Sequence, residues 1–276
     1  MPIFHAIVLG LVQGLSEFLP ISSSGHLLLV PWLFGWNDLD DVSVKKAFDV
    51  SLHLGTLIAV TAYYGRDVVS YVRDGVRSIV RRDRPTTEPG RMARLLVVAS
   101  IPAAVVGVVL ETWIDERLGK PWIIAVSLIG FGLVLAWADR RRGERAFEQV
   151  GLRDAAIIGV AQVLALNPGT SRSGICMSAA RARGFSRDAA ARFSFLLSIP
   201  VTAGAVVVKV GGLVTDGLPD GLLWPMIAGV MTAGLSGWWA VWALMRLIRT
   251  KSFDGFVAYR VLAGVGVMLV LASGWR

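Results

Sequence analysis

The segment QGLSEFLPISSSGH, residues 13–26, places polar and helix-breaking residues inside an apolar stretch that runs from residue 3 to residue 36. A second apolar stretch, residues 154–180, is interrupted in the same way by NPGTSRSG at residues 167–174. Polar, non-helical backbone at membrane depth is tolerated only where protein or a water-filled cavity surrounds it. We therefore expect both stretches to turn back inside the protein as re-entrant hairpins.

The rest of the chain has the composition of an integral membrane protein. Of its 276 residues, 54% are hydrophobic and 17% are charged, whereas a typical soluble domain has about 25% charged residues. A bilayer-spanning helix needs about 17–25 apolar residues, and six uninterrupted stretches meet this length: 47–64, 95–114, 121–138, 190–211, 222–245 and 257–274. The sequence predicts an all-α membrane protein with six transmembrane helices and two re-entrant hairpins.

The Lys and Arg residues orient these spans, because cytoplasmic loops carry an excess of basic residues. Four connecting segments hold 21 of the 28 basic residues: 65–94, 139–153, 181–192 and 246–260. We place these four in the cytoplasm. The segments left outside are acidic or mixed: 37–46, 115–120 and 212–220. The net charge of +8 follows from the cytoplasmic excess, and we expect no nucleic-acid partner.

The two interrupted stretches repeat one another. Five pairs of identical residues share an offset of 149: Gly10/Gly159, Gln13/Gln162, Ser22/Ser171, Ser24/Ser173 and Gly25/Gly174. Three predicted spans follow each hairpin, and an odd number of crossings turns the second half upside down relative to the first. We predict a single membrane domain over residues 1–276, built from inverted halves at about 1–140 and 150–276.

Three ionisable residues in the interrupted stretches are candidates for chemistry, because a charged group at membrane depth is costly and functional by default. Glu17 lies four residues after Gln13, hence on the same helical face. His26 ends the first motif, and Arg172 in the second motif offers a planar fork suited to phosphate oxygens. A carboxylate, an imidazole and a fixed cation together favour phosphoryl transfer. A simpler alternative is that Arg172 only forms an ion pair with Glu17.

The hydroxyls and backbone N–H groups of the two turns favour anion binding, because turns and helix N-termini direct N–H groups at one point. We expect substrate-binding roles for Gln13, Ser22, Ser24, Thr170, Ser171 and Ser173.

Both motifs resemble those of the undecaprenyl-pyrophosphate phosphatase family, also called bacitracin-resistance proteins. Weaker similarity at Phe48-Asp49, residues 193–197 and Tyr259-Arg260 extends the resemblance over nearly the whole chain. It implies hydrolysis of undecaprenyl pyrophosphate to the monophosphate and inorganic phosphate, which recycles the lipid carrier of cell-wall synthesis and confers bacitracin resistance. It also implies a bacterial inner-membrane location, a site facing the outer side, and a divalent cation, Mg²⁺ or Ca²⁺.

The resemblance assigns essential roles to Glu17, His26 and Arg172, and it proposes Ser23 as a nucleophile. The first acidic position of the family is Gln13 in this chain. Glu17 is therefore the expected metal ligand, and Gln13 contributes an amide without charge. Two routes stay open: attack by Ser23 assisted by His26, or attack by water activated by His26 and Glu17.

Two rival functions follow from the same pattern. Inverted repeats with broken helices are a transporter design, so a polyprenyl-phosphate transporter or flippase is the alternative to the enzyme. A structural membrane protein would need none of the three ionisable residues. Small residues such as Gly204, Gly229 and Gly237 are suited to helix contacts within one chain or in a homodimer.

Overall fold

The computed structural model covers the chain and describes all residues except 40, 83–85 and 217–220. The described residues form helices and turns, with one isolated bridge between Arg145 and Phe185. The elements in chain order are α1 (Ile3–Phe18), α2 (Ser23–Phe34), α3 (Val42–Tyr63), α4 (Gly65–Arg81), α5 (Glu88–Arg117), α6 (Pro121–Asp139), η1 (Phe147–Gln149), α7 (Leu152–Gln162), η2 (Val163–Leu166), α8 (Arg172–Ala182), α9 (Arg187–Asp216), α10 (Leu223–Leu247) and α11 (Asp254–Ala272).

Five of the described helices are long and apolar enough to cross a membrane. They correspond to the predicted spans near 95–114, 121–138, 190–211, 222–245 and 257–274, and are the apolar parts of α5, α6, α9, α10 and α11. The sixth predicted span, 47–64, is a helix within α3, whose apolar part Ala47–Tyr63 is shorter than the other five. The protein is therefore an all-α membrane protein with five clear candidate spans.

Each interrupted stretch forms a helical hairpin. Leu19–Ser22 separate α1 from α2, and residues 167–171 separate η2 from α8. Pro20 in the first turn and Pro168 in the second remove backbone donors and prevent the helix from continuing. These turns explain why neither stretch is a single span.

The hairpins open toward opposite ends of the molecule. At one end, named here the terminus end, His5 at the start of α1 stacks on Trp36 with ring centroids 3.8 Å apart, and Arg276 donates to the Leu33 carbonyl. At the other, the arginine end, Arg145 and Arg183 both bind Asp154 at the start of α7. The chain thus enters and leaves the α1–α2 hairpin at the terminus end, and the α7–α8 hairpin at the arginine end.

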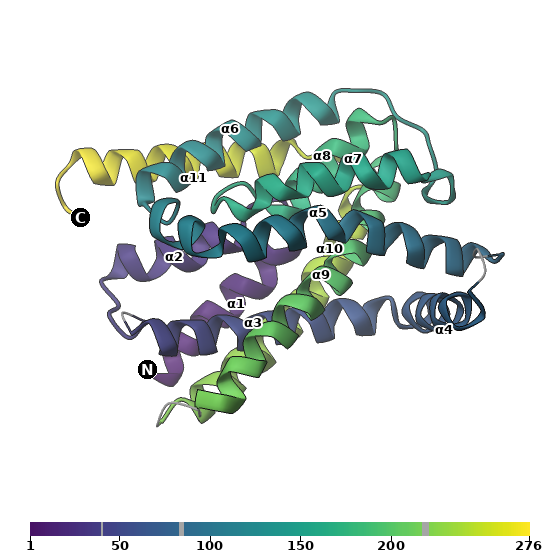
Figure 1. Ribbon diagram of the computed structural model, residues 1–276. Coiled ribbons are helices and arrows are strands. Elements are labelled where there is room, and N and C mark those ends of the chain that lie inside the picture. The colour runs from purple at the N-terminus through teal and green to yellow at the C-terminus, as the bar shows by residue number, and fades with distance from the viewer. Residues whose placement is uncertain (40, 83–85, 217–220) are drawn as a thin grey trace.

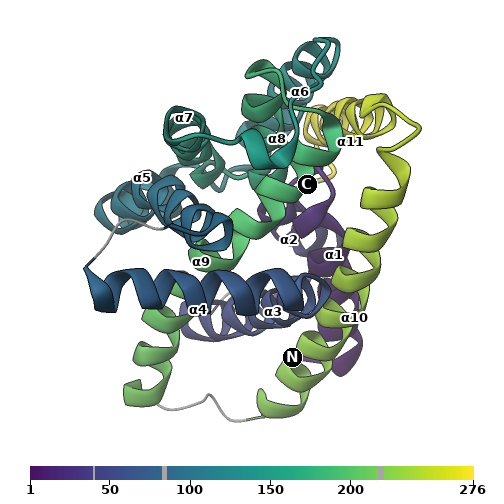
Figure 2. The same cartoon turned by 90° about the vertical axis from the view of Figure 1, so that its right-hand side faces the viewer.

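Helix α4 lies across the arginine end. In Figure 1, α3, α5, α6 and α11 run from side to side while α4 is seen end-on, and Figure 2 shows α4 crossing in front. Asp67 near its start binds Arg192 of α9 at 2.9 Å. One face of α4 exposes Val69, Val72, Val76 and Ile79. The predicted cytoplasmic segment 65–94 therefore contains an amphipathic helix perpendicular to its neighbours, which is typical of a helix lying in a membrane surface.

The helices pair in a matching way in the two halves. Helix α1 packs along α10 and α7 packs along α5, while α6 and α11 lie against one another. Glycines permit the close contacts of the first helix of each hairpin. A Cβ at Gly14 would lie 2.5 Å from the Ala233 carbonyl of α10, and one at Gly159 would lie 2.5 Å from the Ala99 carbonyl of α5.

One charged segment is placed differently from the sequence prediction. Arg260 was counted with the cytoplasmic segment 246–260, but it lies inside α11 and is fully buried. Counting the charges of a segment does not reveal which of its residues lies in a helix with its side chain buried inside the protein. Of the predicted outer segments, Asp40 and Asp220 lie outside the described residues.

The arginine end contains a carboxylate that titrates far from its ordinary range. Burial raises the pKa of Asp154, but hydrogen bonds from Arg145, Arg183 and the Gly151 N–H outweigh it and lower the pKa to about 2. A carboxylate with a depressed folded-state pKa stabilises the fold above its unfolded pKa and loses this contribution as the pH falls.

We predict that the stability contributed by Asp154 is complete above about pH 4 and disappears as the pH falls toward about 2. Thermal unfolding midpoints of the detergent-solubilised protein should fall steeply over this range. In Asp154→Asn the midpoint should start lower and depend less on pH, because the amide does not titrate. An unchanged pH slope in the variant would contradict the assignment.

Candidate active site

The tips of the two hairpins meet in the interior. The hydroxyl of Ser22, in the first turn, accepts a hydrogen bond from the Gly169 N–H of the second turn at 3.0 Å. In the opposite direction, the Ser173 hydroxyl, just after the second turn, donates to the Leu19 carbonyl of the first turn at 3.1 Å. Segments separated by about 150 residues therefore form one polar cluster between the two ends of the molecule.

The two turns share an unusual backbone conformation. Ser22 has a φ of 80° and Ser171 a φ of 73°, values that are rare for residues other than glycine. Each serine caps the helix that follows: the Ser22 hydroxyl accepts from Gly25 N–H, and that of Ser171 accepts from Gly174 N–H. Strained residues of this kind cost about 1–3 kcal/mol and persist where their surroundings hold them. The cap hydrogen bonds and the hydrogen bonds between the two turns keep Ser22 and Ser171 in this conformation.

A buried guanidinium fastens both turns to α6 and α11. Arg260 of α11 is fully buried and, within the described part of the chain, forms no ion pair with a carboxylate. It donates to five backbone carbonyls: Pro20 at 3.1 Å, Gly169 at 2.9 Å, Thr170 at 2.9 Å, Leu128 at 3.0 Å and Ser127 at 3.4 Å. Because a buried charge must be fully hydrogen-bonded, this arrangement fixes the positions of both turns and adds a positive charge beside them.

Glu17 is the centre of the side-chain network. Its Oε1 accepts from Arg172 at 3.1 Å, and its Oε2 accepts from the Ser23 hydroxyl at 2.5 Å and from the Gln13 amide at 3.2 Å. Arg172 also donates to the Ser194 carbonyl at 3.2 Å. The structure therefore brings together four of the predicted residues, and it contains the Glu17–Arg172 ion pair that was the simpler alternative.

His26 points away from Glu17 and contacts Tyr259 of α11. Its Nδ1 lies 2.7 Å from the Ser22 carbonyl, and its Nε2 lies 2.7 Å from the hydroxyl of Tyr259, whose ring stacks on the imidazole. A carbonyl only accepts, so Nδ1 carries a proton and the neutral ring accepts at Nε2 from Tyr259. Among the described contacts, none joins His26 to Glu17 or Arg172.

The predicted phosphate-binding hydroxyls differ in what they contact. Ser22, Ser171 and Ser173 are buried and serve as caps or as contacts between the turns. Thr170 is buried and its hydroxyl accepts from Asn167 at 3.2 Å. Ser24 is exposed, and the described hydrogen bonds do not join it to the other site residues. Substrate binding by these groups stays a prediction, and their observed contacts are structural.

Sequence reasoning missed Tyr259 and the role of Arg260. Both residues were noted only as part of a family resemblance. The signal that could have revealed Arg260 was a single Arg within an otherwise apolar helix. Asn167 was grouped with the second motif without a role. It donates to Ser127 of α6 at 2.7 Å and so anchors the second turn.

The oxygen atoms around Glu17 are of the kind that bind a hard divalent cation, but there are few of them. Within the described residues, no group of three or more His, Cys, Asp and Glu side chains could hold a metal. The Gln13 Oε1, however, is buried without a hydrogen-bond partner, and an orphaned buried acceptor is costly. Mg²⁺ is held by one or two carboxylates plus substrate phosphates. The donors thus fit a cation whose remaining ligands come from a phosphate.

Comparison with known proteins places the chain in a family. The family model described as bacitracin resistance protein BacA matches residues 6–266, which include both hairpins and all the site residues. The chain belongs to this family. Among curated proteins, it is 46% identical over 273 residues to the undecaprenyl-diphosphatase of Geobacter sulfurreducens, with 98% of this chain and 99% of that protein covered. It is 44% identical over 276 residues to the undecaprenyl-diphosphatase of Moorella thermoacetica, with 100% and 99% covered.

We predict that Arg260→Gln destabilises the protein by about 3 kcal/mol or more, because several buried carbonyls lose their donor. The unfolding midpoint in detergent measures this loss. Arg94→Gln, which removes an exposed guanidinium from α5, is the matched control and should change stability by less than about 0.5 kcal/mol. Equal effects of the two substitutions would show that Arg260 does not hold the turns.

Proposed function

We propose that this protein hydrolyses undecaprenyl pyrophosphate to undecaprenyl phosphate and inorganic phosphate, at the meeting point of the two hairpin tips. The relatives named undecaprenyl-diphosphatase cover the chain nearly end to end. The observation that carries the proposal is the contact chain Ser23–Glu17–Arg172, in which a hydroxyl, a carboxylate and a guanidinium from both halves meet in one partly buried cluster.

The membrane placement follows from helix lengths. Helix α8 has 11 residues and runs from the second turn toward the arginine end, a rise of about 16 Å. This is about half of the roughly 30 Å hydrocarbon core, so the hairpin tips lie near the midplane. The two hairpins are then re-entrant from opposite faces, α3 is the sixth span, and the halves form an inverted repeat.

The orientation follows from the basic loops. The arginine end holds the arginine-rich segments 139–153 and 181–192 and faces the cytoplasm. The terminus end, where the α1–α2 hairpin opens, faces the outer side. The lipid diphosphate enters from that side, with its tail between helices.

The charges of the site suit a diphosphate. Glu17 and Arg172 offset one another, while Arg260 adds a second cation that pairs with no carboxylate among the described residues. Arg172 uses two of its nitrogens on Glu17 and Ser194, so further N–H groups of its fork are free to bind phosphate oxygens. Charge that develops on the transferred phosphoryl group is stabilised by such fixed donors.

The hydrogen bonds support Glu17 as the proton acceptor for Ser23. Its hydroxyl donates to Glu17 and not to His26, so Glu17 takes the proton when the Ser23 oxygen attacks the terminal phosphorus. Undecaprenyl phosphate leaves, and water then hydrolyses the phosphoserine to release inorganic phosphate. Attack by a water activated by Glu17 is the competing route. His26 is placed to exchange a proton with Tyr259 in either route.

A divalent cation, Mg²⁺ or Ca²⁺, would be held by Glu17 and the free Gln13 carbonyl oxygen together with the substrate's phosphates. It would supply charge neutralisation on the phosphate oxygens.

Ser23→Ala tests the nucleophile. We expect phosphate release by the purified variant to fall by at least about a hundredfold, because the covalent route is lost. Brief incubation of the wild type with radiolabelled substrate, followed by acid quenching, should yield phosphoserine at residue 23. Full activity of Ser23→Ala would instead assign the reaction to water. Ser273→Ala, which removes an exposed hydroxyl at the C-terminal end of α11, outside the site, is the matched control.

Arg172→Lys tests the phosphate clamp. Lysine keeps the charge but lacks the planar fork, so kcat/KM should fall by about a hundredfold or more, comparable with the loss of one oxyanion donor. Phosphate release from polyprenyl pyrophosphate in detergent measures it, and the unfolding midpoint shows whether the ion pair with Glu17 survives. Near-normal kcat/KM would reject the clamp.

Tyr259→Phe tests the positioning of His26. The variant keeps the stacked ring and removes only the hydroxyl at Nε2. We expect a roughly tenfold fall in kcat with little change in KM, together with a displaced pH profile, because the imidazole loses a hydrogen-bond partner. An unchanged pH profile would mean that the contact is structural only.

A further inference from the structure

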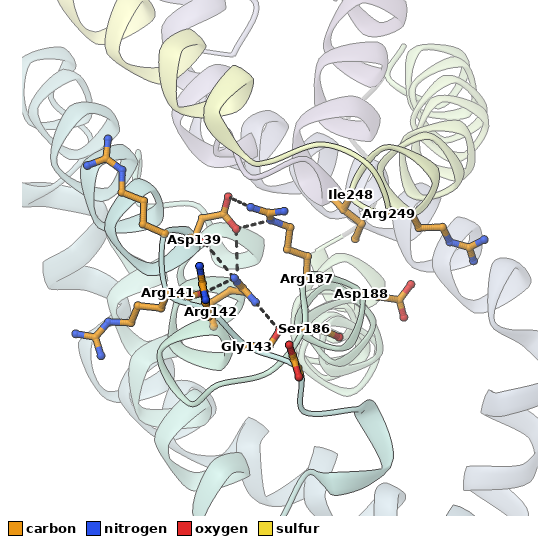
Figure 3. Close-up of a pocket in the computed structure, with 12 residues that line it drawn as sticks. Asp139, Arg141, Arg142, Gly143, Ser186, Arg187, Asp188, Ile248 and Arg249 are labelled. Carbon is orange, nitrogen blue, oxygen red and sulfur yellow. Dashed lines mark hydrogen bonds and ion pairs between the residues drawn. The ribbon is translucent and has the colours of Figure 1, made fainter.

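A basic pocket of about 540 Å³ opens at the arginine end, and Figure 3 shows the residues that line it. It includes Arg181 of the last turn of α8, at the opposite end of this helix from the hairpin tips. Its lining contains six guanidiniums and three carboxylates: Arg140, Arg141, Arg142, Arg181, Arg187 and Arg249, with Asp139, Glu144 and Asp188. The volume is within the range of about 300–1,000 Å³ typical of small-molecule sites. None of these residues takes part in the reaction proposed above.

The base of the pocket is a built ion-pair cluster. Asp139, the last residue of α6, is buried and binds Arg187 at 2.6 Å and Arg181 at 3.5 Å. Arg181 also donates to the carbonyls of Phe185 and Gly143. Figure 3 shows Arg187 reaching Asp139, whereas Arg249 points away from this pair. Two of the six guanidiniums, those of Arg181 and Arg187, are therefore already paired with Asp139 at the base of the pocket.

The rim of the pocket has two arginines without an ion pair among the described residues, although Glu144 and Asp188 also line the pocket. Arg142, in the loop after α6, and Arg249, directly after α10, are exposed and form no ion pair within the described residues. In Figure 3, Arg142 and Arg249 lie on opposite sides of the Asp139–Arg187 pair. A site with unpaired guanidiniums on two sides favours a phosphate group, whose oxygens accept from more than one fork.

The pocket lies at the level where a membrane meets water. It is lined by the last residue of α6, the first of α9 and the two residues that follow α10, three of the candidate spans. The guanidinium of Arg141 lies 4.1 Å above the ring of Trp137, and Trp137 and Trp242 are exposed near the same helix ends. Exposed Trp residues mark the membrane–water boundary, as does the amphipathic helix α4 at this end.

We propose that this pocket binds the phosphate headgroup of an anionic membrane phospholipid, such as phosphatidylglycerol. The acyl chains of a lipid in the adjacent leaflet reach the membrane beside Trp137 while its headgroup lies among the arginines. Basic pockets between membrane helices recognise anionic headgroups in this way. Helix α8 begins at Arg172 and places Arg181 of its last turn in the pocket lining. The bound lipid therefore also fixes the far end of the helix that carries the site's cation.

The test uses the full chain, delipidated in non-ionic detergent, with bound lipid counted by native mass spectrometry during titration. Dioleoyl-phosphatidylglycerol should bind saturably and at least about tenfold more tightly than dioleoyl-phosphatidylcholine. Arg142→Gln/Arg249→Gln should weaken phosphatidylglycerol binding by roughly thirtyfold. The matched control, Arg94→Gln/Arg153→Gln, removes two exposed arginines elsewhere at the arginine end and should bind like the wild type. Unfolding midpoints confirm that both variants are folded.

Three outcomes would overturn the proposal. Equal weakening in both double variants would assign the binding to general surface charge. Equal affinity for the zwitterionic lipid would remove the phosphate selectivity. Binding of inorganic phosphate or glycerol phosphate as tight as that of the whole lipid would identify a soluble anion as the ligand.

Discussion

The site depends on one interaction, the contact of the Arg260 guanidinium with the main chain of both turns. Each hairpin tip is non-helical backbone in an apolar surrounding, and such backbone is stable only if its carbonyls find donors. Arg260 supplies them to Pro20 in one half and to Gly169 and Thr170 in the other. The same charge that satisfies the carbonyls also makes the cluster attractive to an anion.

The remaining site geometry follows from this junction. Once the turns are joined, α1 ends and α8 begins beside one another, and Glu17 meets Arg172 across 155 positions of sequence. The two residues come from different halves, so neither hairpin alone forms the ion pair. The buried pair also keeps each charge compensated before a ligand arrives, which an isolated carboxylate or guanidinium at that depth would not be.

The sequence predicted the two hairpins because helix breakers within apolar stretches have a direct physical meaning. It also predicted most of the long helices, since span length is set by bilayer thickness. It did not predict α4, because a dense run of arginines was interpreted only as a marker of orientation. It misplaced Arg260, because charge counting does not reveal a guanidinium that carbonyls surround. The helix caps formed by Ser22 and Ser171 were not predicted, because caps and φ values above 70° depend on turn geometry that spacing alone does not define. Substrate binding by their hydroxyls stays a prediction.

Both chain ends are tied to the loop that follows α2. His5 stacks on Trp36, and Arg276 lies beside Gly35 and donates to the Leu33 carbonyl. The two ends of the polypeptide therefore lie near one another on a single face of the molecule. A short linker could join them without crossing the rest of the structure. Circular permutants with new ends in the connection between α4 and α5 should keep the hairpin junction intact, since neither helix takes part in it. Tags fused at residues 1 and 276 would therefore lie on one face of the molecule.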